Sequence, residues 1–462
     1  MERNCSMHST NFYRAFSSLL LALGLVLFLA LPGCSPKNTF KAVFKKQSPY
    51  EKYRAGLKDA KLDQTALGQQ WVAAGEQALQ KPVPVTLPFK ETGYFPANKP
   101  MAASYQFKVQ RGQKVAVKVQ TQGQEVPQVF IDLFEANPDN AAQPKQVAYA
   151  DTTAQSLDYE IEEDLPHLLR VQPELLRSGQ YTVTIETQPT LAFPVQGKDS
   201  RAVQSFWGAE RDAGARKHEG VDIFAARLTP VVAAVEGVVT RVNVTPIGGK
   251  VVWLSDLKRQ QSLYYAHLDS QLVQPGQRVA VGDVLGLMGN TGNAITTAPH
   301  LHFGIYRFGE GAVDPYPFVY QDRTKPTALK VDEKKLGSWA RVAKSNVALR
   351  ESPASSANSL LTLPLHTPLQ VLAGSATWYR VQLPDGQQGY VTASLVESLD
   401  KPLQAVRLTR PADLLDASSE KASSRKSLPA DTTVRVLARQ EGYWLVKDAH
   451  GTIGWVSEDA AR

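Results

Sequence analysis

The sequence is poor in cysteine: of its 462 residues, only Cys5 and Cys34 carry a thiol. A structural zinc site is normally closed by four protein ligands, often thiolates, so this composition disfavours one. Cys5 lies in an N-terminal segment that we expect to be removed. Cys34 would then be the only cysteine of the mature chain, which excludes an intrachain disulfide even in an oxidising compartment.

The sequence also lacks a basic segment interleaved with aromatic residues, although its formal net charge is +7 at pH 7. We therefore predict no nucleic-acid partner. A basic balance suits an anionic wall or membrane equally well, and it also suits solvated charge without a single partner. With 43% hydrophobic and 21% charged residues, a chain of this length is expected to fold into several globular domains.

The longest apolar stretch, from Ser17 to Leu31, is short for a spanning helix, which needs about 20 apolar residues. Residues 1–33 are predicted to be a signal peptide, because Leu31-Pro32-Gly33-Cys34 resembles the bacterial lipobox. That resemblance implies lipidation of Cys34 and a membrane anchor there. An uncleaved anchor is the alternative.

The residue after the cysteine is Ser35, not the aspartate that favours inner-membrane retention in Gram-negative sorting. By that resemblance we predict a cell-envelope protein in the outer membrane, facing the periplasm. A Gram-positive host, with a single membrane, is the alternative.

Four of the eight histidines lie between residues 218 and 302. In a strand, His300 and His302 would point to the same side, because side chains at i and i+2 share a face. The same parity relates His218 to Asp222 in extended chain, and the alternation that ends at His267 can bring a third strand to the same cleft. Three N/O ligands with an open fourth position are what a hydrolytic zinc requires.

Three motifs in this order, His218-x-x-x-Asp222, Tyr265-Ala-His267-Leu and Pro299-His300-Leu-His302-Phe, resemble the lysostaphin-type (LytM-like) zinc peptidases that cut peptidoglycan cross-links. The likeness runs from Phe206 to Tyr320 and includes Arg211. It implies that His218, Asp222 and His302 bind Zn²⁺, and that His267 and His300 form an unligated catalytic pair. Such a zinc lowers the pKa of bound water to about 7, and a neutral imidazole can accept the water proton.

The chain as a whole is predicted to be mainly β and multidomain. Strand-like alternation with intervening turns indicates a β-sandwich before the peptidase, and Ser48-Pro49 marks the start of a helix. The acidic run from Glu160 to Asp164 is interpreted as a solvated edge, with a calcium site as the alternative. The predicted parts are 1–33 signal peptide, 34–85 tether and helical segment, 86–190 β-sandwich spacer or regulatory domain, 195–322 antiparallel-β peptidase domain, and two small SH3-like barrels at 337–398 and 402–462.

The two C-terminal segments are similar to each other: 378–391 aligns with 443–456. They resemble bacterial SH3-like domains, which implies attachment to peptidoglycan. Their aromatic residues, including Trp378 and Trp455, either line a peptide groove or belong to the core. At the front of the copies, we align Asn346 to Pro353 with Val406 to Pro411.

Together these features predict an envelope lipoprotein with a zinc metalloendopeptidase that hydrolyses peptidoglycan cross-links or stem peptides. The expected partners are peptidoglycan, the membrane through the lipid on Cys34, and an unidentified regulatory protein. One alternative is a catalytically inactive, wall-binding activator of a peptidoglycan amidase; such proteins typically lack ligands that this sequence retains. A structural wall-binding lipoprotein is the other.

Overall fold

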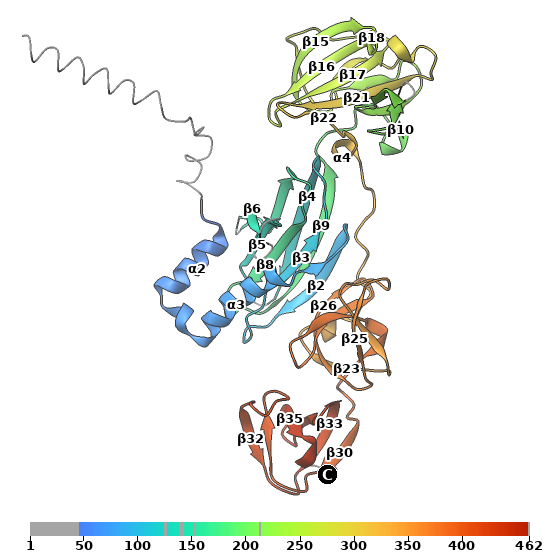
Figure 1. Cartoon of the computed structure of the whole chain (residues 1–462). Coiled ribbons are helices and arrows are strands. Elements are labelled where there is room, and N and C mark those ends of the chain that lie inside the picture. The colour runs from blue at the N-terminus through green and yellow to red at the C-terminus, as the bar shows by residue number, and fades with distance from the viewer. Residues whose placement is uncertain are drawn as a thin grey trace, which may run out of the picture. The chain divides into compact units, whose positions relative to one another are not determined.

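The computed structural model describes residues 46–123, 127–137, 140, 143–151, 153–211 and 214–460 (Figure 1). The predicted signal peptide, Cys5 and Cys34 lie outside these residues. Residues Ser48–Arg462 form one compact unit, and strands predominate in it, which confirms the mainly β, multidomain class. Within the described ranges, no helix has the length and apolar character needed to span a membrane.

The helical segment consists of two helices, α2 (Pro49–Asp59) and α3 (Ala66–Gln80). Ser48 caps α2 in a reciprocal capping box with Glu51. The segment breaks after α2, where Lys61 adopts a left-handed backbone with φ 57°. Trp71 of α3 stacks on Tyr50 and donates a hydrogen bond from Nε1 to the Pro173 carbonyl at 2.8 Å. The helices therefore pack on the following β domain.

That domain has two sheets whose inner faces share one apolar core. One sheet has the order β1-β3-β8-β5-β6, and the other contains β2-β9-β4-β7. This is the predicted β-sandwich. Its strands are β1 (Val83–Pro84), β2 (Phe89–Phe95), β3 (Ala103–Phe107), β4 (Gln113–Gln122), β5 (Val129–Glu135), β6 (Lys145–Tyr149), β7 (Ser156–Glu160), β8 (His167–Pro173) and β9 (Gly179–Pro189).

The next domain is built on a sheet of order β10-β13-β21-β17-β16-β15-β19 with β22 beside β21. Its pairs are antiparallel, and a smaller sheet, β14-β20-β18, packs nearby. The strands are β10 (Val203–Ser205), β11 (Glu210–Arg211), β12 (Arg216–Lys217), β13 (Val221–Phe224), β14 (Pro230–Val232), β15 (Gly237–Thr245), β16 (Gly249–Asp256), β17 (Gln261–Leu268), β18 (Ser270–Gln271), β19 (Arg278–Val279), β20 (Val284–Leu287), β21 (His300–Arg307) and β22 (Gly311–Val313), followed by helix α4 (Tyr316–Val319).

The acidic run is not a solvated edge throughout. Glu160, at the end of β7, forms ion pairs with Lys258 at 2.8 Å and with Arg259 at 2.9 Å. Arg259 also pairs with Asp256 at 3.0 Å. The interpretation from sequence was wrong for Glu160, because its partners lie about a hundred residues further along the chain, in the next domain.

The first C-terminal repeat contains β23 (Trp339–Val342), β24 (Val347–Arg350), β25 (Ser359–Leu363), β26 (Pro368–Ser375), β27 (Trp378–Gln382), β28 (Gln388–Thr392) and β29 (Val396–Ser398). The second contains β30 (Gln404–Arg407), β31 (Ala412–Leu415), β32 (Ser424–Leu428), β33 (Thr433–Gln440), β34 (Tyr443–Lys447) and β35 (Ile453–Ser457). From β23 to β28, every strand recurs 65 residues later with the same length: β23 begins at Trp339 and β30 at Gln404.

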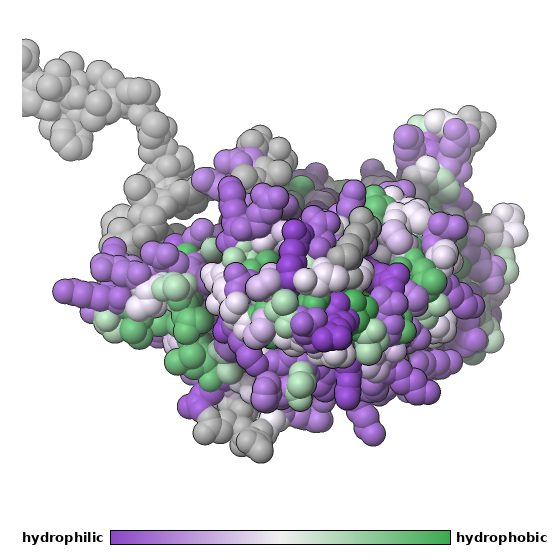
Figure 2. Space-filling model, turned by 90° about the horizontal axis from the view of Figure 1, so that it is seen from below, coloured by the Kyte–Doolittle hydropathy of each residue, from purple (hydrophilic) through white to green (hydrophobic). Residues whose placement is uncertain are grey.

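This constant offset corrects the alignment made from sequence at the front of the repeats. The counterpart of Val347–Arg350 is Ala412–Leu415, whereas Val406 lies in β30, which corresponds to β23. Trp455 is buried, but in a cluster with Trp339 of the first repeat rather than in the core of its own repeat, and Trp378 is only half-buried. The face shown in Figure 2 is mostly hydrophilic, with apolar side chains in separate patches.

Candidate metal centre

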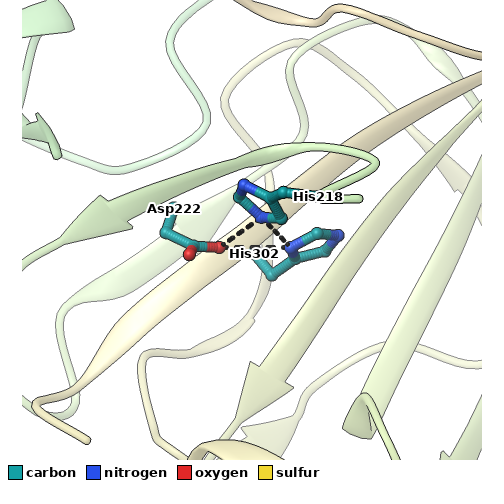
Figure 3. Close-up of side chains that lie close together, drawn as sticks. All are labelled: His218, Asp222 and His302. Atoms are coloured by element: carbon teal, nitrogen blue, oxygen red, sulfur yellow. Dashed lines mark hydrogen bonds and ion pairs between the residues drawn. The ribbon is translucent and has the colours of Figure 1, made fainter. Parts of the chain in front are cut away.

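Three side chains that the sequence placed on one face meet in the structure: His218, Asp222 and His302 (Figure 3). Asp222 lies in β13 and His302 directly opposite it in β21, as antiparallel Cα partners. His218 precedes β13 by three residues and lies outside the strand. The sheet register thus sets two members, and the chain before Gly220 brings in the third.

The three potential ligand atoms form a nearly equilateral triangle. His218 Nε2 lies 3.0 Å from Asp222 Oδ1 and 2.9 Å from His302 Nδ1, and the third side measures 3.1 Å. Tetrahedral Zn²⁺ with bonds of about 2.0–2.1 Å separates its ligands by about 3.3 Å. The donor set of two imidazoles and one carboxylate therefore fits zinc, and these residues form a possible metal site with room for a fourth ligand.

Hydrogen bonds outside the triangle orient His218 and Asp222. The Phe206 carbonyl accepts a bond from His218 Nδ1 at 2.9 Å, which fixes the proton there and directs the Nε2 lone pair inward. Arg211 donates to Asp222 Oδ2 at 2.7 Å and to Ser205 Oγ at 2.6 Å. Burial raises the pKa of Asp222, but the adjacent imidazoles of His218 and His302 outweigh it and hold that pKa far below its usual range.

The other two predicted histidines lie beside the triangle. The rings of His267 and His300 are 4.9 Å apart, and His267 is 6.0 Å from the ring of His302. His267 Nδ1 donates to the Thr291 carbonyl and His300 Nδ1 to the Ala298 carbonyl, each at 2.9 Å. Both rings therefore keep Nε2 available for a substrate or water.

The local backbone at His267 is unusual, with φ 62° near the end of β17. A non-glycine residue rarely takes this left-handed conformation, and such strain is concentrated at functional sites. Burial and the neighbouring His300 lower the pKa of His267 to about 4. Its imidazole is therefore neutral at pH 7, and its Nε2 carries a lone pair.

An open cleft of about 750 Å³ contains all five residues. Its wall includes Trp253, Tyr264 and Tyr306, whose rings lie 4.5 to 6.2 Å apart. Tyr264 meets the His302 ring edge-on at 5.9 Å. Every residue that lines this cleft falls between Ser205 and Tyr306, so its walls come from the same domain as the triangle.

Sequence reasoning grouped the five polar residues but missed the aromatic wall and the role of Arg211. Arg211 was part of the family pattern, but no spacing rule links it to Asp222. The aromatic residues carried a usable signal for Tyr306, which has the same parity in its strand as His300 and His302 and therefore shares their face. The register of Tyr264, opposite Gly304, emerges only in the sheet.

Comparison with known families identifies the domain. The family model described as peptidase family M23 matches residues 216–315, the segment that contains the triangle. The chain carries an M23 peptidase domain. A second model, the bacterial SH3 domain, matches residues 345–397, which is the first C-terminal repeat.

Similar proteins match over the M23 domain. An L-Ala–D-Glu endopeptidase of Bacillus subtilis is 35% identical over 139 residues, 28% of this chain and 42% of that protein. The peptidoglycan DD-endopeptidase ShyC of Vibrio cholerae is 36% identical over 91 residues, 19% of this chain and 20% of that protein. The catalytic domain of lysostaphin from Staphylococcus simulans is 30% identical, covers 26% of this chain and 94% of its own, and has a TM-score of 0.24. The chain spans less than half the length of the two curated relatives.

Proposed function

We propose that this protein is a zinc-dependent endopeptidase that hydrolyses peptide bonds in peptidoglycan cross-links or stem peptides during cell-wall remodelling. One observation carries the proposal: an M23 domain with a complete His-Asp-His triangle next to two imidazoles whose Nε2 atoms remain available. An inactive amidase activator has no need of all five groups.

His218 Nε2, Asp222 Oδ1 and His302 Nδ1 would hold the ion. Bound Zn²⁺ supplies a Lewis acid that polarises the scissile carbonyl and acidifies water. Arg211 keeps the carboxylate of Asp222 turned so that one oxygen faces the two histidines. The carbonyl of Phe206 keeps the proton of His218 on Nδ1, so the ligand nitrogen does not need to lose one.

The unligated histidines would move the protons. His267, neutral at pH 7, accepts a proton from the attacking water at Nε2. His300 has its Nδ1 proton committed to the Ala298 carbonyl, and when protonated at Nε2 it can donate to the developing oxyanion. The aromatic wall of Trp253, Tyr264 and Tyr306 borders the open cleft and would position an extended peptide.

The location follows from the predicted leader. Cleavage before Cys34 and its lipidation would tether the chain to a membrane, and Ser35 favours the outer membrane facing the periplasm. The substrate and the anchor would then share one compartment. The proposal includes an unidentified regulatory protein as a further partner.

The test is digestion of purified peptidoglycan by the full chain, with the products identified by mass spectrometry. We expect new peptide ends that name the cleaved bond, and no such ends with His302→Ala. His450→Ala, an exposed histidine in the second repeat, is the matched control and should digest normally. Intact peptidoglycan with every protein, in the presence of zinc, would contradict the proposal.

A further inference from the structure

The first SH3-like repeat joins the β-sandwich through a continuous sheet. Thr92 and Gly93 of β2 pair with Gly374 and Ala373 of β26 in antiparallel register. Ser375 Oγ adds a hydrogen bond to the Lys90 carbonyl at 2.8 Å. The edge strands of two domains thus cover each other, which removes two exposed edges.

A buried polar cluster lies behind this pairing. Glu91 of the sandwich is fully buried. Its carboxylate accepts hydrogen bonds from Tyr105 at 2.6 Å and Tyr390 at 2.7 Å, and pairs with Arg380 at 2.9 Å. Arg380 also donates to Tyr181 Oη at 2.8 Å. A buried carboxylate is costly unless it is paired and hydrogen-bonded. Two of the three partners of Glu91, Arg380 and Tyr390, come from the first repeat. The carboxylate is therefore fully paired only while the two domains are in contact.

The protonation states agree with this arrangement. Burial, followed by the charge of Glu91, raises the pKa values of Tyr105 and Tyr390 well above their usual range. Both phenols therefore keep their protons and act as donors to the carboxylate. Separation of the domains would expose Glu91 and Arg380 to water. When the domains reassemble, the ion pair between these two side chains must form again.

The second repeat packs on the first through apolar groups. Ala438, Leu445 and Trp455 are buried in a cluster that includes Trp339 of the first repeat. The rings of Trp339 and Trp455 meet edge-to-face, with centroids 5.9 Å apart and planes at 82°. Aromatic pairs of this geometry contribute beyond the area that they bury.

Backbone contacts accompany this apolar cluster. The Arg439 amide donates to the His366 carbonyl at 3.0 Å. In return, the guanidinium of Arg341, itself buried, donates to the Leu437 carbonyl at 2.6 Å. The contact therefore uses strand β33, which is the counterpart of β26.

The two contacts use corresponding positions. With the offset of 65 residues, Arg380 corresponds to Leu445 and Tyr390 to Trp455. Gly374, which pairs with the sandwich, corresponds to Arg439, which bonds to the first repeat. We define the docking face by four positions of each repeat. In the first repeat they are Ala373, Gly374, Arg380 and Tyr390, and in the second they are Ala438, Arg439, Leu445 and Trp455.

We propose that the docking face is the means by which each SH3-like repeat attaches to another domain of the same chain, the first repeat to the β-sandwich and the second repeat to the first, and that this face is not a peptidoglycan-binding site. The corresponding positions make different contacts in the two repeats. In the first repeat they form an ion pair with Glu91, and in the second they form an apolar cluster. Leu445 and Trp455 could not replace Arg380 and Tyr390, because Glu91 would stay buried without a counter-charge. Each repeat is thereby specific for its own neighbour.

The surface that receives a repeat is absent from the second one. Gln404 and Asp431 stand where Trp339 and His366 stand in the first repeat, and both are exposed. The second repeat therefore does not offer the receiving surface that the first repeat offers to it.

Hydrogen exchange measured by mass spectrometry on the full chain tests the first contact. Arg380→Gln and the milder Tyr390→Phe should each speed exchange in both partner strands, residues 89–95 and 368–375, with a loss of protection of about tenfold or more for Arg380→Gln. Lys344→Gln, an exposed change in the same repeat, should leave both strands as in the wild type. Unchanged exchange in 89–95 with either docking variant overturns the proposal.

Two further measurements separate docking from wall binding. Trp339→Ala and Arg341→Gln should speed exchange in residues 433–440 but not in 89–95, because the second contact is independent of the first. In a pelleting assay with purified peptidoglycan, Tyr390→Phe and the wild type should bind equally. Weaker pelleting by Tyr390→Phe with wild-type exchange would assign the face to the wall and overturn the proposal, whatever the outcome of the digestion assay.

Discussion

Arg211 and Asp222 share a single strong contact: Nη2 of the arginine lies 2.7 Å from Oδ2 of the carboxylate. The other oxygen, Oδ1, faces His218 at 3.0 Å and His302 at 3.1 Å. One oxygen of the Asp222 carboxylate is therefore held by the arginine, and the other is free to bind a metal ion together with the two histidines. The arginine in turn is held by Ser205, so the strand pair β10 and β13 supports both residues.

Removal of Arg211 should leave the Asp222 carboxylate in place as a metal ligand but no longer hold it in one orientation. We expect Arg211→Ala to weaken zinc binding about 10- to 100-fold, as is typical for partners of metal ligands, and Arg211→Lys to weaken it less. Competition with a coloured chelator measures the affinity. Arg278→Ala, an exposed arginine on β19, should bind zinc like the wild type. Equal affinity in Arg211→Ala would show that the carboxylate does not need this anchor.

The two unligated histidines should affect turnover without affecting metal content. We predict that His267→Gln and His300→Gln each retain zinc but lose activity by about 10²- to 10⁴-fold, the usual contribution of general acid–base groups. Zinc content and the rate of peptidoglycan digestion are measured on the same preparations, with His450→Gln as the control. A variant that loses its zinc would instead identify that histidine as a ligand.

Metal removal should destabilise one domain selectively. Zinc that binds the folded site stabilises it by about 2.7 kcal/mol when free zinc exceeds the dissociation constant 100-fold. Calorimetry of the full chain should therefore show one transition that moves to lower temperature with a chelator and returns when zinc is added. Transitions that stay in place in both conditions would contradict a site in the folded M23 domain.

The contact between the β-sandwich and the M23 domain should depend on pH. Burial alone would raise the pKa of Glu160, but Lys258 and Arg259 outweigh it and lower that pKa from its usual 4.5. A depressed pKa stabilises the fold above the unfolded-state pKa, and this contribution is lost as the pH falls through the folded-state value. Glu160 is one-third exposed, so the solvent-screened contribution is about 1 kcal/mol or less.

Comparison of Glu160→Gln with the wild type at several pH values checks this dependence. The variant should be less stable at pH 7 and approach the wild type below pH 4.5, as the wild-type carboxylate becomes protonated. Glu236→Gln, on an exposed glutamate of the M23 domain, should show no such difference. A deficit in Glu160→Gln that persists unchanged into acid would mean that the carboxylate charge is not involved.

Short-range rules predicted much of the site. The two-residue period of a strand placed His300 and His302 on one face, and the motif order brought His218, Asp222 and His267 to the same cleft. The period fails locally at His267, where the left-handed backbone ends the alternation. No propensity rule predicts that conformation for histidine, because the surrounding sheet imposes it.

Long-range contacts could not be predicted. Tyr390 bonds to Glu91 across 299 residues, and Glu160 meets Arg259 across 99. We expected the aromatic residues of the repeats to line a groove or to belong to a core, whereas Tyr390 is buried against another domain. Charge and burial at such contacts depend on a partner that sequence spacing does not specify.

The central claim is tested most directly by titrating zinc-free protein with Zn²⁺ while following the release of peptides from purified peptidoglycan. We predict that activity rises linearly and reaches its maximum at one zinc per chain, and that His302→Ala stays inactive throughout. Cleavage by the zinc-free protein, or a domain that binds zinc at this site but never cleaves, would contradict it.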